Sequence, residues 1–201
     1  MTGLSSRRPY GDRLVELAAQ LHATPGITVS LCRIGAPASD EELDALLARA
    51  GGKLPEGLGD FYASVNGFQL VWQGGDTEGE GPDGGSVQFL PIDRLFGDWR
   101  GVTWFDDFEG GDRYRAVQPF DLFEDEACGA FWQEDGLAPQ SDVHLHWFGE
   151  GDISLDISFP TYVDRLIEMR GYRYWQLTVP SGVHERTEAA GIHARVARLF
   201  G

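Results

Sequence analysis

Apolar side chains recur at helical spacing over residues 40–50, where Leu43, Leu46, Leu47 and Ala50 form one stripe and charged residues fall elsewhere on the helix. Ser39 and Glu42 stand three residues apart just before this run. That spacing predicts a capping box, in which the serine hydroxyl and the glutamate carboxylate each accept a backbone N–H at the helix start. We therefore expect an amphipathic helix that begins near Asp40.

Similar patterns predict the remaining elements. A second helical run covers residues 58–65 and ends at Asn66-Gly67, a pair that favours a left-handed turn. Helices are predicted over 12–22, 40–50, 58–65, 162–170 and 185–200, and strands over 27–31, 68–72, 86–90, 115–123, 127–133, 143–148 and 152–159. The expected fold class is α+β in a single domain, with an antiparallel or mixed β-sheet of about five to seven strands and helices packed mainly on one face.

One stretch carries a resemblance to a known family. A capped helix, Leu-Pro, a short helix with Phe-Tyr, then Asn-Gly and a hydrophobic strand follow one another in this order. The residues that carry the pattern are Glu42, Leu54, Pro55, Phe61, Tyr62, Asn66 and Gly67. This order resembles the signature of the SUKH superfamily, whose founding members are fungal cell-wall synthesis regulators. Residues 89–95 and 156–175 fit the same pattern.

The similarity spans roughly residues 30–180, so the predicted helices 12–22 and 185–200 are additions to a common core within one domain of residues 1–201. The resemblance implies an α+β domain that is common in bacteria as the immunity partner of secreted toxins, many of them nucleases. Elsewhere such domains serve as protein-binding modules.

Length and composition narrow the class of protein. A chain of 201 residues with 42% hydrophobic residues is long and apolar enough for one sizeable core. No apolar run approaches the roughly 18 residues that span a bilayer, and the N-terminal segment lacks a signal-peptide hydrophobic region. We expect a cytoplasmic protein. Cys32 and Cys128 lie far apart and predict neither a zinc ribbon nor a disulfide scaffold.

The negative charge of the chain is concentrated in one region. Residues 76–160 contain twenty Asp or Glu and four Arg, a net charge of −16, and the rest of the chain is balanced at twelve against twelve. Such a region repels nucleic-acid phosphates and anionic lipids, and it favours a basic protein partner. The alternative is that the acidic loops serve solubility alone.

The candidate partner-binding residues lie in this acidic region. Trp104 is the candidate anchor, because aromatic rings bury a large area at low entropy cost. The alternative is that the rings around Trp104 turn inward and the acids outward. The full set is Asp76, Glu78, Glu80, Asp83, Trp104, Asp106, Asp107, Glu109, Asp112, Glu124, Asp125 and Glu126.

His144 and His146 stand two apart and thus share one face of a strand, with Asp142 and Asp152 close in sequence. Such a pair could ligate zinc if a third ligand converged on it. Structural zinc normally takes four ligands, and no His-Glu-x-x-His helix accompanies the pair. We expect Val143, Leu145 and Trp147 to form the buried face of this strand and both histidines to lie on the wetter side of the sheet. We also expect no metal or other cofactor to be bound.

Catalytic motifs are missing from the sequence. There is no Gly-x-Ser-x-Gly elbow, no phosphate loop and no cysteine in a recognisable histidine context. Gly79, Gly81 and Gly84 have dinucleotide-loop spacing, but Pro82 and nearby carboxylates oppose a pyrophosphate. We expect a protein that is not an enzyme.

The leading functional hypothesis is a non-catalytic immunity protein that neutralises a cognate toxin through an acidic surface, with nucleases as one class of toxin that the resemblance implies. The first alternative is an intracellular regulatory or scaffold module that docks another protein. The second is a metal-dependent hydrolase that uses His144 and His146. The sequence leaves open the partner's identity and the oligomeric state.

Overall fold

The computed structural model describes residues 8–74, 83–107, 109–179 and 186–201. The helices are α1 (Tyr10–Ala23), α2 (Asp40–Arg49), α3 (Leu58–Tyr62), α4 (Phe159–Glu168) and α5 (Arg186–Phe200), with 3-10 helices η1 (Ile92–Arg94), η2 (Gly111–Tyr114) and η3 (Trp175–Thr178). The strands are β1 (Thr28–Ile34), β2 (Phe68–Gln73), β3 (Gly84–Phe89), β4 (Val117–Asp121), β5 (Ala127–Trp132), β6 (Asp142–Trp147) and β7 (Gly151–Ser158).

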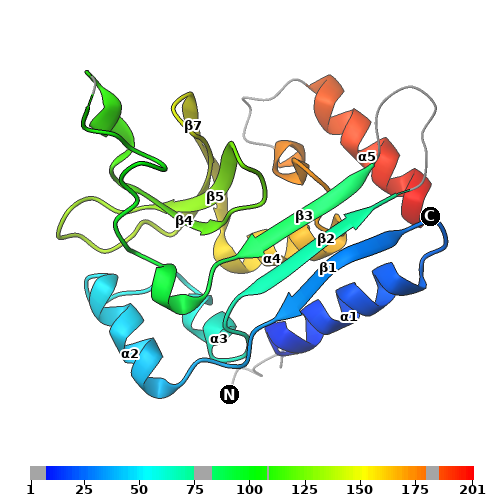
Figure 1. Cartoon of the computed structure of the whole chain (residues 1–201), viewed down its shortest axis with the longest axis horizontal. Helices are drawn as coiled ribbons and strands as arrows, with labels where there is room; N and C mark the ends of the chain where they lie inside the picture. Colours follow the sequence, from blue (N-terminus) through cyan, green and yellow to red (C-terminus); the bar gives the residue numbers. More distant parts are fainter. Residues whose placement is uncertain (1–7, 75–82, 108, 180–185) are drawn as a thin grey trace, which may run out of the picture.

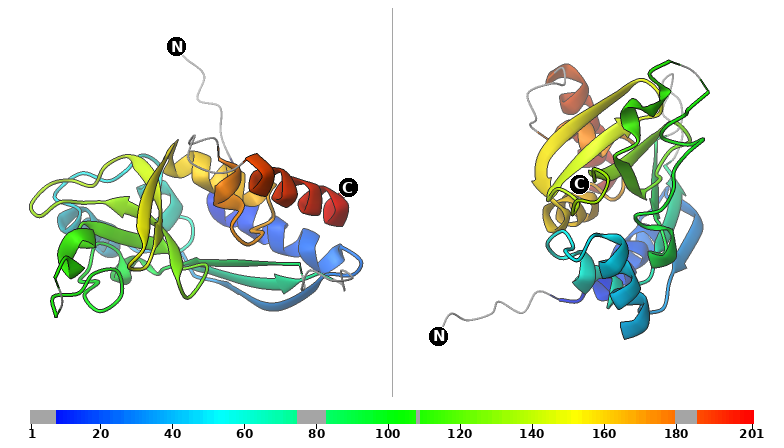
Figure 2. Two further views of the ribbon diagram at one scale, coloured as in Figure 1. Left: turned by 90° about the horizontal axis from the view of Figure 1, so that it is seen from above. Right: turned by 90° about the vertical axis from the view of Figure 1, so that its left-hand side faces the viewer.

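The strands form one antiparallel sheet in which spatial order follows chain order, β1 to β7. Short links join consecutive strands from β4 to β7, whereas the longer links before β2 and before β4 carry α2 and α3, and η1 and η2, respectively. Helices α1, α4 and α5 lie together on one side of β1–β3 (Figures 1 and 2). The fold is therefore α+β, and the predicted class is confirmed.

The sheet divides into two parts at the β3–β4 junction. The only ladder pair there is Phe89 with Asp121, supported by hydrogen bonds from Leu90 N to Phe120 O (2.9 Å) and from Leu122 N to Gln88 O (3.0 Å). A bulge between Pro119 and Asp121 bends β4 just before this junction. As a result β4–β7 turn away from β1–β3 (Figure 1).

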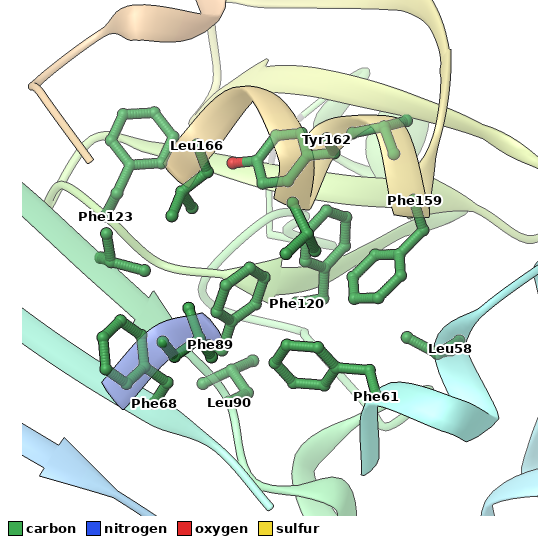
Figure 3. Close-up of a cluster of buried hydrophobic side chains, with 14 of the residues drawn as sticks. Leu58, Phe61, Phe68, Phe89, Leu90, Phe120, Phe123, Phe159, Tyr162 and Leu166 are labelled. Carbon is green, nitrogen blue, oxygen red and sulfur yellow. The ribbon is translucent and has the colours of Figure 1, made fainter. Parts of the chain in front are cut away.

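An aromatic cluster fills the angle between the two parts of the sheet. Phe61 of α3 lies 4.9 Å from Phe89 of β3, and Phe120 of β4 lies 5.1 Å from Tyr162 of α4, measured between ring centroids. Phe159 contacts the rings of both pairs, and all five side chains are buried (Figure 3). Burial of each ring contributes about 1.5–3 kcal/mol to the stability of the folded state. The cluster joins four elements that are distant in sequence.

Residues of the sequence pattern within 39–67 form hydrogen bonds around this core. The predicted capping box is present, with Ser39 N donating to Glu42 Oε2 (2.8 Å) and Glu42 N to Ser39 Oγ (3.3 Å). Asn66 Oδ1 accepts from Ile92 N (2.7 Å), and the Tyr62 hydroxyl donates to Leu90 O (2.7 Å). The bonds of Tyr62 and Asn66 tie α3 and the turn before β2 to residues 90–92.

Some boundaries differ from the sequence predictions. Helix α3 ends at Tyr62, so the second helical run is shorter than expected. Helix α4 begins at Phe159, directly after β7, because Pro160 fits the first helical turn. Strand β1 extends to Ile34, through positions with little burial that alternation alone does not indicate.

Candidate protein-binding surface

A compact loop carries four of the predicted acidic residues. The backbone closes on itself through hydrogen bonds from Gly101 N to Trp104 O (2.7 Å) and from Phe105 N to Gly111 O (2.8 Å). Gly110 adopts φ 75°, a conformation that glycine favours, and turns the chain into η2. The loop exposes the carboxylates of Asp106, Asp107, Glu109 and Asp112.

The second acidic segment is the turn between β4 and β5. Glu124 is half-buried and pairs with Arg173 Nε at 3.1 Å. Glu126 is exposed and accepts a hydrogen bond from the Tyr174 hydroxyl (2.7 Å). Burial raises the pKa of Glu124, against the opposing effect of Arg173, and Asp125 and Glu126 raise it further. This turn therefore already crowds like charges.

The turn between β6 and β7 connects the two acidic segments. Arg113 Nη2 donates to Gly149 O (2.6 Å), and Phe148 N donates to Glu126 O (2.9 Å). Glu150 in the same turn is exposed. We call the exposed carboxylates along these three segments the acidic rim: Asp106, Asp107, Glu109, Asp112, Asp125, Glu126 and Glu150.

Several rim carboxylates have no cationic partner. Arg100 pairs with Asp106 at 2.5 Å, but within the described ranges Asp107, Glu109, Asp112 and Asp125 form no ion pair. An exposed carboxylate without a partner retains its full charge toward an incoming molecule. Together with Glu126 and Glu150, which also form no ion pair within the described ranges, these residues give the rim its free negative charge.

Asp83 departs from its predicted place on this surface. It is 4% exposed, and its carboxylate accepts from the Tyr172 hydroxyl (2.7 Å) and from Arg198 Nη2 (2.7 Å). Its neighbours come from the C-terminal region, which sequence proximity to the acidic loop does not reveal. Asp83 is thus an internal support for α5. The candidate residues Asp76, Glu78 and Glu80 lie outside the described residues.

Trp104 is half-buried and packs against the main core, with the Arg115 guanidinium 5.3 Å from its ring centroid. The ring is therefore neither an exposed anchor nor fully internal. Each of the two interpretations of the aromatic loop describes Trp104 only in part. The side chain fixes the loop on the sheet while the neighbouring acids point to solvent.

The sheet face beneath this loop carries the histidine pair. His144 Nδ1 lies 2.6 Å from Asp152 Oδ2, and His146 Nδ1 lies 3.8 Å from Asp152 Oδ1. His146 is fully buried beside the rings of Tyr114 (4.6 Å) and Phe148 (5.7 Å). The prediction that both histidines lie on the wetter side is wrong, because η2 and the β6–β7 turn cover this face. Val143 and Leu145 do face the main core, as predicted, and Trp147 packs against it half-buried.

The arrangement of the pair is that of two histidines sharing one carboxylate. Both Nδ1 atoms face Asp152, and the described residues include no group of three or more His, Cys, Asp or Glu that could hold a metal ion. Burial lowers the pKa of His146, against the opposing effect of Asp152. A buried imidazole that resists protonation is suited to packing.

Sequence reasoning missed a buried carboxylate, Asp121. Its oxygens accept from Gln88 N (2.8 Å) and from the Tyr162 hydroxyl (2.8 Å), which in turn accepts from Gln176 Nε2 (2.9 Å). Burial raises the pKa of Asp121 to about 6, although both hydrogen bonds to the carboxylate lower it. The sequence signal that could have revealed this burial is a single acid in the largely apolar run of β4. Its polar network lies at the β3–β4 junction.

No helix in the described ranges is long and apolar enough to cross a bilayer. Comparisons of this chain with protein-family models, with curated protein sequences and with solved structures gave no match.

Proposed function

We propose that this protein is a non-catalytic, SUKH-type protein-binding domain that neutralises a basic cognate toxin by covering the toxin's positive surface. The observation that carries the proposal is the acidic rim, with Asp107, Glu109, Asp112 and Asp125 exposed and not ion-paired within the described part of the chain. The resemblance of residues 39–67 to the SUKH pattern supports the same function.

The physical basis is electrostatic steering. Complementary charge accelerates encounter by ten- to about a thousandfold at low salt, and an inhibitor of a toxin made in the same cell must bind before the toxin acts. The rim residues lie on η2 and on turns that are closed by backbone hydrogen bonds. The backbone that presents the carboxylates is therefore already ordered when a partner arrives. Preformed surfaces lose less entropy on binding.

The test is co-expression with the polypeptide encoded immediately upstream of this gene, followed by stopped-flow association of the two purified proteins. We expect the protein to restore growth, and the association rate to fall steeply between 0.05 and 0.5 M NaCl. Rescue of a nuclease would favour that class of toxin. Retention of a housekeeping protein from the same cells, with no toxin silenced, would instead favour the regulatory or scaffold function.

A pair of matched variants separates the rim from overall charge. The rim variant is Asp107→Asn/Glu109→Gln/Asp125→Asn, and the control is Asp44→Asn/Glu56→Gln/Asp60→Asn on α2, α3 and the link between them, where the same three amides replace exposed acids. We expect the rim variant to associate at least about tenfold more slowly and the control to change little. Equal protection and equal rates for both variants would refute the proposal.

A further inference from the structure

The first three strands form a region without carboxylates. Residues 24–38, 61–73 and 84–92 contain no Asp or Glu and a single charged residue, Arg33, in a chain with 32 acids. These segments supply β1, β2 and β3. One part of the sheet therefore carries almost no charge, while the rest of the molecule is strongly negative.

The outer face of β1–β3 carries polar and apolar side chains, with Arg33 as its one charged residue, in cross-strand rows. Arg33, Gln69 and Gln88 form one row, and Leu31, Val71 and Ser86 form the next, as the strand register requires. Helices α1, α4 and α5 lie on the other side of these strands (Figure 2, left).

A shallow groove of about 300 Å³ continues the first of these rows at one end. Gly35, Gly67 and Pro91 line it beside Ile34, which is 39% exposed. The face is thus partly apolar and open to approach from outside.

The two edges of the sheet differ in how they are protected. Strand β7 carries Asp152 and Asp156, and Asp156 adopts φ 53°, which interrupts a regular strand edge. Strand β1 has a bulge at Ser30 but runs regularly from Leu31 to Ile34. Among the described residues no strand pairs with its outer side. The free edge of β1 is therefore the edge that can accept another strand.

We infer that the β1 edge, with the adjoining carboxylate-free face, is a self-association surface that pairs β1 with β1 of a second copy. Antiparallel pairing of one strand with itself forms a two-fold, isologous interface. Two copies of net charge −16 repel one another wherever acids meet. Pairing through β1 keeps the acidic rims at opposite ends, because the loop of residues 100–115 lies far from β1 (Figures 1 and 2).

The interface is small, so the association is weak. A stable interface commonly buries about 800 Å² on each partner, and a seven-residue strand edge supplies less. We expect sedimentation velocity to show monomer at low micromolar concentration and dimer at several hundred micromolar. Salt should strengthen this dimer by screening like charges, whereas it should weaken binding of a basic partner at the rim. The two proposals can therefore fail independently.

Cysteine chemistry provides a direct probe. Cys32 lies in β1 and is exposed, and Cys128 is buried. A short bis-maleimide should cross-link the wild-type protein into a dimer at high concentration, and Cys32→Ser should abolish the product. A dimer seen by sedimentation that yields no Cys32 cross-link would overturn the assignment to β1.

A charge insertion tests the edge without mutating the core. Ile34→Glu places carboxylates in both copies of the edge, and Leu137→Glu adds the same charge at a 56% exposed site in the β5–β6 link. Like charges at a strand pair weaken pairing, so we expect the dimer dissociation constant to rise about tenfold for Ile34→Glu and little for Leu137→Glu. A wild-type protein that stays monomeric near 1 mM in high salt, or equal weakening by both variants, would overturn the inference.

Discussion

At the residue scale, the most unusual group is the Asp121 carboxyl, which is buried in the core and accepts hydrogen bonds only from neutral donors, Gln88 N and the Tyr162 hydroxyl. Its pKa is raised to about 6, whereas a carboxyl in an unfolded chain titrates near 3.9. The folded state therefore holds this proton more tightly than the unfolded state. The resulting stabilisation is complete below about pH 4 and is lost as the pH rises through 6.

Asp121→Asn should remove this pH dependence. Relative to the wild type, the variant should gain about 3 kcal/mol of unfolding free energy between pH 4 and 7.5, because two pKa units correspond to about that much. Loss of the hydrogen bond from the Tyr162 hydroxyl to residue 121 should lower the unfolding free energy of the variant by about 1 kcal/mol at every pH. Urea unfolding at several pH values measures the difference. Asp107→Asn, at an exposed site, is the control, and a difference that does not vary with pH would contradict the pKa assignment.

His146 should contribute a pH dependence of the opposite sign. Burial lowers its pKa below the ordinary value of about 6.5, so the unfolded chain binds this proton first as the pH falls. Stability should decrease below about pH 6.5. His146→Phe keeps an aromatic ring against Tyr114 and should flatten unfolding free energy between pH 7 and 5. The same substitution at the exposed His22 is the control for the change of residue type. An unchanged slope in His146→Phe would argue against burial of this imidazole.

At the scale of elements, α5 is held by contacts at its middle and at its C-terminal end. Arg198 reaches the buried Asp83, Phe200 lies 5.4 Å from Trp72 between ring centroids, and Ile192 is 8% exposed. The helix thus closes the end of the β2–β3 hairpin. Asp83, which its position in the sequence assigns to the surface, instead stabilises a distant helix.

Asp83→Ala should loosen α5. The change leaves the Tyr172 hydroxyl and Arg198 without this acceptor, which should cost about 1–3 kcal/mol. Hydrogen exchange of residues 192–200 should speed up more than exchange in β4–β7. Asp93→Ala, at an exposed site in η1, serves as the control. Unaltered exchange in α5 would show that the apolar contacts suffice.

At the scale of the whole molecule, charge is separated along the sheet. The carboxylate-free strands β1–β3 form one part, and the acidic rim borders the other, beyond the narrow β3–β4 junction. Crowded like charges oppose the compact state, and their repulsion is screened over about 10 Å at 0.1 M salt and 3 Å at 1 M. Stability should therefore depend on ionic strength.

Raising NaCl from 0.05 to 0.5 M should stabilise the protein by about 1 kcal/mol, which raises the melting temperature by roughly 2–4 °C for a chain of this size. Differential scanning calorimetry measures the shift. The variant Asp107→Asn/Glu109→Gln/Asp125→Asn should melt higher in low salt and respond less to added salt. A salt response equal to that of the wild type would mean that rim repulsion is negligible.

The sequence by itself determined features that depend on neighbouring residues. The capping box at Ser39, the left-handed Gly67 (φ 88°) and the alternation of β2 follow from spacing and backbone preference, which act within a few positions. The order of all seven strands was not readable in this way, because long links such as residues 35–67 and 90–116 do not by themselves select a neighbouring strand. The α+β class and the concentration of acids in residues 76–160 were likewise readable from the chain.

Only the tertiary structure decided which polar residues are buried. Asp83, Asp121 and His146 lie inside because Arg198, Tyr162 and Tyr114, from distant segments, pack against them. A local pattern places a side chain on one face of a strand but does not say what covers that face. Burial depends on contacts between segments far apart in sequence, and those contacts separate the exposed rim from the acids that support the fold.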